Sequence, residues 1–218
     1  ICSWSIGVEQ PQIIDFFTSA VDILSRTFDG IDLPPHVAEA LARCEPLDRI
    51  DRLLIYADGS SLPEHRRKPP AQVEQEGNGD TWAFAVLGEQ YVDSTSSRIN
   101  LLGWTAQPVL YDPSATHFIG SQNVGSETAE REAMFWCGAW RLAQNCNIPT
   151  TFCTDSWSAG CQADGTNGSC KSDESFLNLR AIFQSLEGSL PGCLDIRHVR
   201  GHSNDPWNDL VEDRKSVV

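Results

Sequence analysis

The order of strand-like and helix-like segments constrains the fold of this chain more than any other feature. Three apolar runs rich in strand-forming residues come first, at 52–57, 80–88 and 99–111, and their spacing predicts an antiparallel meander. The third run is expected to bend near Gly103. From residue 126 onward the patterns alternate: we expect helices at 126–145, 156–162, 173–186 and from 205, and strands at 149–154 and 193–199. A meander followed by this alternation predicts a mixed α/β sheet.

Residues 1–50 are expected to form a helical linker or arm before this sheet. Apolar side chains recur at helical spacing between residues 11 and 28, and a second short helix is expected at 36–44. Because the sequence begins with Ile1, we expect it to be a piece of a longer chain. We therefore divide it into an arm at 1–50, a domain at 51–213 and a tail at 214–218.

The charge of the chain limits its partners. Its formal net charge is −14, which argues against general binding to polyanions because the overall repulsion opposes it. Local basic clusters at 65–68 and 197–202, or bound divalent cations, could reverse that repulsion at one surface. No apolar run is long enough to cross a bilayer and no signal peptide is visible, so we expect an intracellular protein in the cytoplasm or nucleus, with no membrane partner.

Eight cysteines occur singly along the chain. They include no CxxC pair, which makes a zinc ribbon an unfavoured interpretation. Several lie inside apolar patterns, so most are expected to be small core residues in a reducing compartment, with a disulfide pair as the less favoured alternative.

Two of the expected strands end in an acidic residue. The run 52–57 is followed by Asp58-Gly59-Ser60, and the run 149–154 is followed by Asp155-Ser156. A buried strand with Asp58 at the point where it emerges is one interpretation. The alternative is that Asp58-Gly59 is an ordinary turn after a strand.

Further acids could join these two. The carboxyl ends of parallel strands lie side by side, Glu130 falls in the first turns of one expected helix, and Asp209, Glu212 and Asp213 fall on the last. Converging carboxylates repel one another and need cations to coexist, and hard oxygen ligands select Mg²⁺ or Mn²⁺. The alternative is that these acids are ordinary surface charges of an acidic protein. The order strand-Asp, helix-Glu, strand-Asp, helix-acid favours a metal site.

Four motifs in order give the chain a resemblance to a known family. They are Tyr56-Ala57-Asp58-Gly59-Ser60, Thr128-Ala129-Glu130-Arg131-Glu132-Ala133, Thr154-Asp155-Ser156, and His198-Val199-Arg200-Gly201-His202-Ser203 running on to Pro206-Trp207-Asn208-Asp209-Leu210-Val211-Glu212. With this set, residues 50–213 resemble a ribonuclease H domain of the type carried by retroelement reverse transcriptases. The resemblance implies an α/β, ribonuclease H-like fold with a five-stranded mixed sheet, three strands antiparallel and two parallel, flanked by helices.

The resemblance also implies an activity and its residues. The family cleaves the RNA strand of an RNA–DNA hybrid and leaves a 3′-hydroxyl. Asp58, Glu130, Asp155 and Glu212 would hold two Mg²⁺ ions, which Mn²⁺ could replace, with Asp209 or Asp213 as a substitute for Glu212. His202 would lie on a mobile loop and assist proton transfer or product release, while His198 would be structural or a phosphate contact. Candidate contacts to the hybrid are Gly59, Ser60, Asn123, Ser126, Thr128 and Ser156. An upstream reverse transcriptase module in the same polyprotein is the other expected partner.

Three features depart from the family pattern. Glu212 stands where the family has Asp, and the extra methylene displaces the carboxylate. The tail after it has no helical apolar pattern and matches one reading frame of a sequencing adapter, so we interpret 214–218 as a non-native or disordered tail and Glu212 as completed by that adapter. The loop 164–172 holds one basic residue, Lys171, where some relatives carry a basic helix, which predicts weak hybrid binding by the isolated domain.

Two other functions remain open from the sequence. The chain could be another nuclease or strand transferase of the same fold. It could also be a catalytically impaired remnant that binds nucleic acid or packs against a polymerase, which Glu212 and the early end of the last helix favour.

Overall fold

The computed structural model describes residues 50–62, 68–69, 72, 79–115, 117–144, 146–166, 174–201 and 205–215. The expected arm at 1–50 lies outside the described residues except for Ile50, and so do 216–218 of the expected tail. Parts of the expected loops at 61–79 and 164–172 also lie outside them.

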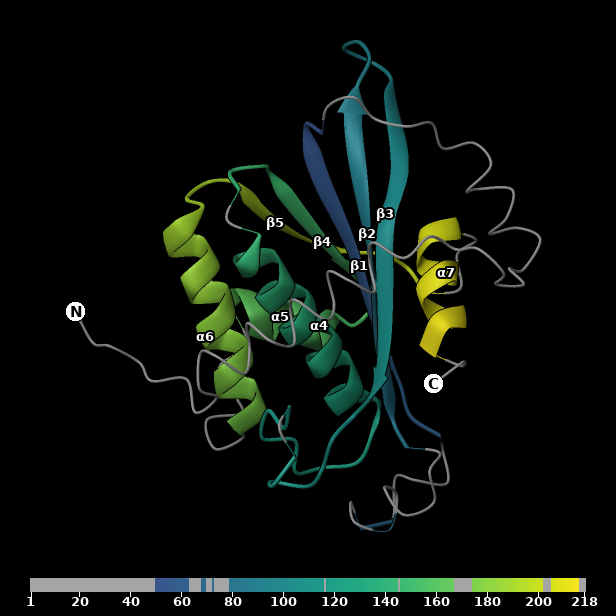
Figure 1. The fold of residues 1–218 in the computed structure, drawn as a ribbon, viewed down its shortest axis with the longest axis vertical. Helices are drawn as coiled ribbons and strands as arrows, with labels where there is room; N and C mark the ends of the chain where they lie inside the picture. Colours follow the sequence, from purple (N-terminus) through teal and green to yellow (C-terminus); the bar gives the residue numbers. More distant parts are fainter. Residues whose placement is uncertain are drawn as a thin grey trace.

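Five strands form one mixed sheet in the order β3-β2-β1-β4-β5 (Figure 1). The antiparallel pairs are β1–β2 and β2–β3, and the parallel pairs are β1–β4 and β4–β5. This confirms the predicted five-stranded sheet with three antiparallel and two parallel strands. The strands are β1 (Arg52–Ser60), β2 (Thr81–Tyr91), β3 (Ser97–Pro108), β4 (Thr150–Thr154) and β5 (Leu194–His198).

Helices cover both faces of this sheet. Figure 1 shows α4 (Ser126–Ala143), α5 (Trp157–Asp164) and α6 (Glu174–Ser189) on one face and α7 (Pro206–Lys215) on the other. Parallel neighbours require a crossover connection, and here the crossovers run through the three helices of the first face. Within the part of the chain that the structure describes, no helix is both long and apolar enough to cross a membrane.

The central strand β1 is buried on both faces, which explains its unbroken apolar sequence. Leu53, Ile55 and Ala57 belong to the hydrophobic cluster under α4 and α6, while Leu54 and Tyr56 belong to the second cluster, under α7. The alternation of side chains along a strand therefore divides one apolar run between two cores.

The strand β1 is buried, as the first interpretation of Asp58 expected, but it extends beyond the predicted 52–57. Residues 58–60 continue the strand and pair with residues 81–83 of β2, so Asp58 lies within β1 and Asp58-Gly59 is not a turn. The turn preference of an Asp-Gly pair is local, and the ladder with β2 overrides it.

The other predicted elements are present with shifted ends. The helix α4 begins at the predicted residue, Ser126, with Gly125 as its N-cap, and ends at Ala143 rather than at 145. The expected bend near Gly103 is confirmed as a register shift opposite Val86 and Leu87. Among the described cysteines, Cys137 and Cys153 are buried and free, whereas Cys146, Cys161 and Cys193 are half-buried and free.

Candidate metal centre

Three carboxylates from three elements meet near the carboxyl ends of β1 and β4. Asp58 lies on β1, Glu130 in the second turn of α4, and Asp155 directly after β4. One oxygen from each lies within 4.8 Å of the other two. Asp58 is 1 % exposed, and the other two residues are half-buried. The structure thus brings together three of the acids that the sequence analysis singled out.

Gly59 makes this meeting of β1 and α4 feasible. A Cβ atom added at Gly59 would lie 2.1 Å from the Glu130 backbone nitrogen and 2.2 Å from the Ala129 carbonyl carbon. The helix backbone therefore packs directly on the strand at this position, where only glycine fits. Asp58 precedes Gly59 on the strand, and the Glu130 backbone is part of the contact on the helix. The close approach of the two backbones therefore sets the spacing of the Asp58 and Glu130 carboxylates. The predicted contact of Gly59 with a hybrid stays a prediction.

Asp155 is held between a strand and a helix. Its carbonyl oxygen lies 3.0 Å from Nε2 of His198, the last residue of β5. Its other neighbour, Ser156, is the N-cap of α5: the Ser156 hydroxyl accepts from the Ala159 amide at 3.3 Å. The parallel ladder and the helix cap thus fix the backbone from which the Asp155 side chain extends.

The loop after β5 passes directly over Asp155. A Cβ atom added at Gly201 would lie 2.6 Å from Asp155 Oδ2, so the Gly201 backbone lies against that carboxylate. His202 follows Gly201 in the sequence but lies outside the described residues, and its role stays a prediction.

The donor set of the triad fits a hard divalent cation. Two carboxylate charges this close repel by roughly 3 kcal/mol per pair at an effective dielectric constant of about 20. A divalent cation between the carboxylates replaces this repulsion with attraction of each carboxylate to the ion. Three carboxylate groups offer oxygen ligands alone, which favours Mg²⁺ or Mn²⁺ over metals that prefer nitrogen or sulfur.

The predicted fourth ligand is not part of this cluster. Glu212 lies on α7, where its Oε1 accepts a hydrogen bond from the Asn208 side chain at 3.3 Å. Neither Glu212 nor its proposed substitutes Asp209 and Asp213 belongs to the group of acids found among the described residues. Their role as ligands stays a prediction.

The residues predicted to contact a hybrid also have structural positions within the chain. The Thr128 hydroxyl donates to the Asn123 carbonyl at 2.6 Å, and Thr128 is buried. Ser60 ends β1 opposite Thr81, and Ser126 begins α4. A contact between any of these residues and a substrate stays a prediction.

A second set of buried polar groups supports the start of α4, and sequence analysis did not single it out. Asp80 is fully buried, and its Oδ2 accepts from the Tyr111 hydroxyl at 2.5 Å and from the Gly125 amide at 2.7 Å. Glu132 accepts from the Ser121 hydroxyl, and burial raises the pKa of Glu132 to about 8. The sequence places Asp80 at the start of an apolar run, and nothing else in it predicts that this residue is buried and hydrogen-bonded.

Comparison with known proteins finds solved structures that are similar to this chain in fold. No family model matches the chain, and no curated protein matches it. The N-terminal RNase H domain of a Mycobacterium tuberculosis protein is 15 % identical, with 78 % of this chain and 96 % of that chain covered and a TM-score of 0.49. RNase H1 of Halobacterium salinarum is 12 % identical, with 77 % and 99 % covered and a TM-score of 0.48. LC11-RNase H1, isolated from compost and solved in complex with an RNA/DNA hybrid, is 12 % identical, with 76 % and 97 % covered and a TM-score of 0.47.

The chain has a ribonuclease H-like fold, given by its strand order and by the helices on the two faces of the sheet.

Proposed function

We propose that this chain is a metal-dependent ribonuclease H that hydrolyses the RNA strand of RNA–DNA hybrids, as one module of a retroelement polyprotein with an upstream reverse transcriptase. The observation that supports the proposal is the convergence of Asp58, Glu130 and Asp155 on one point of a ribonuclease H-like sheet. The four motifs in order support it further.

In this proposal the three acids hold divalent ions, with Glu212 as the fourth ligand. When bound, two such ions activate a water molecule and stabilise the charge that develops at phosphorus. The buried Asp58 and the backbone-anchored Asp155 keep the ligand oxygens in place without reorganisation. His202, which follows Gly201 in the sequence, would move a proton in the reaction. Recognition would use groove shape and 2′-hydroxyl groups rather than sequence.

A cleavage assay tests the proposal. The chain is incubated with Mg²⁺ and an end-labelled RNA–DNA hybrid, and in parallel with duplex RNA and duplex DNA of the same sequence. We expect cleavage of the RNA strand of the hybrid alone, with 3′-hydroxyl products, and its loss in Asp155→Asn. An unchanged rate in Asp155→Asn, or equal cleavage of duplex DNA, contradicts the proposal.

A catalytically impaired remnant is the second candidate, because Glu212 lies outside the carboxylate cluster and is bonded to Asn208. Glu212→Asp separates the two. The side chain of Glu212 is one methylene longer than that of aspartate. If this extra length misplaces the fourth ligand, Glu212→Asp restores or raises cleavage while leaving hybrid binding unchanged. A chain that binds the hybrid and cleaves it in neither form is a remnant.

A further inference from the structure

Trp157 stands apart from the other tryptophans in the described part of the chain. It is 70 % exposed, whereas Trp82, Trp136, Trp140 and Trp207 are each buried. It is also the first residue of α5, two positions after Asp155. An indole ring can remove a large apolar area from water, and here that area is left open beside the carboxylate triad.

A second ring lies against Trp157. The imidazole of His198 meets the indole edge to face, with ring centroids 5.7 Å apart and an angle of 72° between the planes. The Nε2 atom of His198 lies 3.0 Å from the Asp155 carbonyl oxygen, and because a carbonyl can only accept, Nε2 donates. In the neutral ring Nδ1 is then an acceptor.

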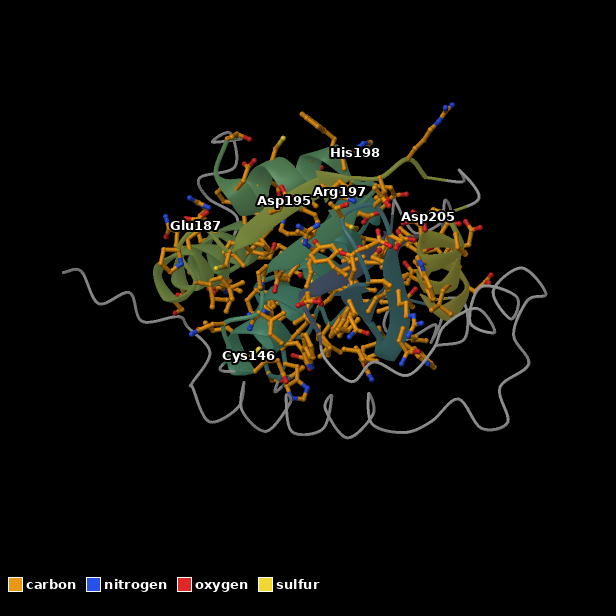
Figure 2. All side chains as sticks on the ribbon, turned by 90° about the horizontal axis from the view of Figure 1, so that it is seen from above. Cys146, Glu187, Asp195, Arg197, His198 and Asp205 are labelled. Carbon is orange, nitrogen blue, oxygen red and sulfur yellow. The ribbon has the colours of Figure 1, made fainter. Side chains whose placement is uncertain are left out.

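These rings border a pocket of about 80 Å³. Its lining is mixed: Ile196 and Gly160 are apolar, while Ser156 and Asp164 are polar. Within the chain, the Ser156 hydroxyl accepts from the Ala159 amide and Asp164 Oδ1 accepts from the Thr166 amide. Figure 2 shows His198 at the end of β5 that lies toward α7, with Asp195 nearer the other end and Glu187 on α6 beyond it. The pocket therefore lies at the same end of the sheet as the triad and shares the segment 154–156 with it.

We propose that this pocket binds one unpaired nucleobase of the nucleic acid whose backbone reaches the carboxylate triad. The inference rests on the proposed function. A planar neutral ring with N–H donors suits an exposed indole, an imidazole edge and a carboxylate, whereas a phosphate group would be repelled by Asp164. Base stacking on an aromatic side chain is independent of sequence, because every base has a π-face.

Gly160 provides a test that leaves the fold intact. A Cβ atom added there would lie 3.5 Å from Ile196 Cγ2 and 3.6 Å from Thr154 Cγ2, which are ordinary contacts with two lining residues. Gly160→Ala therefore narrows the pocket without strain, and alanine favours the helix over glycine. Gly188 is a matched control, since it also lies in a helix and an added Cβ would meet nothing within 4 Å.

The experiment compares two RNA–DNA hybrids by fluorescence anisotropy, with Ca²⁺ in place of Mg²⁺: one fully paired, the other with a single bulged nucleotide. We expect the chain to bind the bulged hybrid more tightly, by about tenfold. Trp157→Ala and Gly160→Ala should abolish this preference, Trp157→Phe should reduce it, and Gly188→Ala should retain it. An abasic residue in place of the bulged base should also remove it.

The result that overturns the inference is equal binding of the two hybrids by the unmodified chain, or a preference that survives Trp157→Ala. A preference retained when the bulged base is abasic overturns it as well. Cleavage with Mg²⁺ is scored separately. A chain that keeps the preference without cleaving contradicts the proposed function alone, and one that cleaves without the preference contradicts this inference alone.

Discussion

At Gly59, the absence of a side chain determines how closely α4 can approach β1. The nearest helix atoms belong to the backbone of Ala129 and Glu130, so they cannot rotate away as a flexible side chain could. The spacing of Asp58 and Glu130 depends on this contact. A change of one methyl group at Gly59 should therefore affect both stability and the triad.

We predict that Gly59→Ala destabilises the chain by about 1–3 kcal/mol or more, because the added Cβ overlaps the helix backbone. The measurement is urea unfolding followed by circular dichroism. Gly188→Ala is the control and should be neutral or stabilising by up to about 1 kcal/mol, since nothing lies near its added Cβ. Equal midpoints for the two variants would show that the close approach at Gly59 is absent.

Residue types with distinctive chemistry were visible in the sequence, whereas residues that act through packing were not. Asp58, Glu130 and Asp155 could be singled out because each falls at a predictable place on a strand or helix. The contact made by Gly59 depends on the distance between two elements, which no local pattern encodes. The exposure of Trp157 was equally hidden, since an indole in a helix is compatible with a core position.

At the scale of elements, the start of α4 depends on a residue from another part of the chain. The N-cap residue Gly125 has no side chain to accept hydrogen bonds, and Asp80 accepts from its amide instead. Tyr111 bonds the same Asp80 oxygen. A buried carboxylate close to the positive end of the helix is electrostatically favourable. The cap of α4 is therefore supplied by a residue far away in the sequence, which no local pattern indicates.

We predict that Tyr111→Phe lowers the free energy of unfolding by about 1–3 kcal/mol, because a buried carboxylate loses a hydrogen-bond donor. Thermal unfolding with and without Mg²⁺ is the measurement. Tyr91→Phe is the matched control, since Tyr91 is 47 % exposed on β2, and it should change stability little. A Tyr111→Phe variant as stable as Tyr91→Phe would mean that the bond to Asp80 is not formed in solution.

The turn between β2 and β3 depends on a single carboxylate. Asp93 accepts hydrogen bonds from the amides and hydroxyls of Thr95 and Ser96, and these bonds lower its pKa from 3.8 to about 2. A lowered pKa in the folded state means that the charged form stabilises the turn. This contribution is complete above pH 3.8 and is lost as the pH falls through about 2.

We predict that NMR titration of the Asp93 side chain gives a midpoint near pH 2, and that Asp93→Ala loosens the 92–96 turn at neutral pH. Hydrogen exchange of the Val92 amide, which donates to the Ser96 carbonyl, reports the second effect. Exchange should be faster in Asp93→Ala at pH 7, with no change in β4. A midpoint at the ordinary value of an aspartate would contradict the hydrogen-bonded turn.

The ends of elements were predicted less well than their order. Period and apolar content locate an element, but its last residues are determined by the partner strand or helix, as residues 58–60 of β1 show.

For the whole molecule, the topology followed from the sequence because meander and crossover connections leave few alternatives. Two strands joined by a short turn, such as β2 and β3, are antiparallel neighbours, whereas parallel neighbours need a crossover connection such as a helix. The position of α7 on the opposite face was not predicted. It follows from the second hydrophobic cluster, where Leu210 and Val211 cover Leu54 on the side of β1 away from α4.

The triad places three repelling charges at the junction of β1, β4 and α4, so the folded state should bind divalent ions more strongly than the unfolded chain does. We predict that saturating Mg²⁺ raises the free energy of unfolding by about 2.7 kcal/mol at a concentration 100 times the Kd. For a domain of this size that is a rise in Tm of about 5–10 °C. Differential scanning calorimetry in EDTA and in Mg²⁺ measures it.

Asp155→Asn separates a specific site from general screening of an acidic protein. Removing one of the three charges relieves repulsion, so this variant should be more stable than the unmodified chain in EDTA and should gain little from Mg²⁺. Asp195→Asn changes the net charge by the same amount at an exposed position on β5, and it should keep the full Mg²⁺ response. If Asp155→Asn and Asp195→Asn respond alike, Mg²⁺ acts on the overall charge, and the three carboxylates do not form a metal centre.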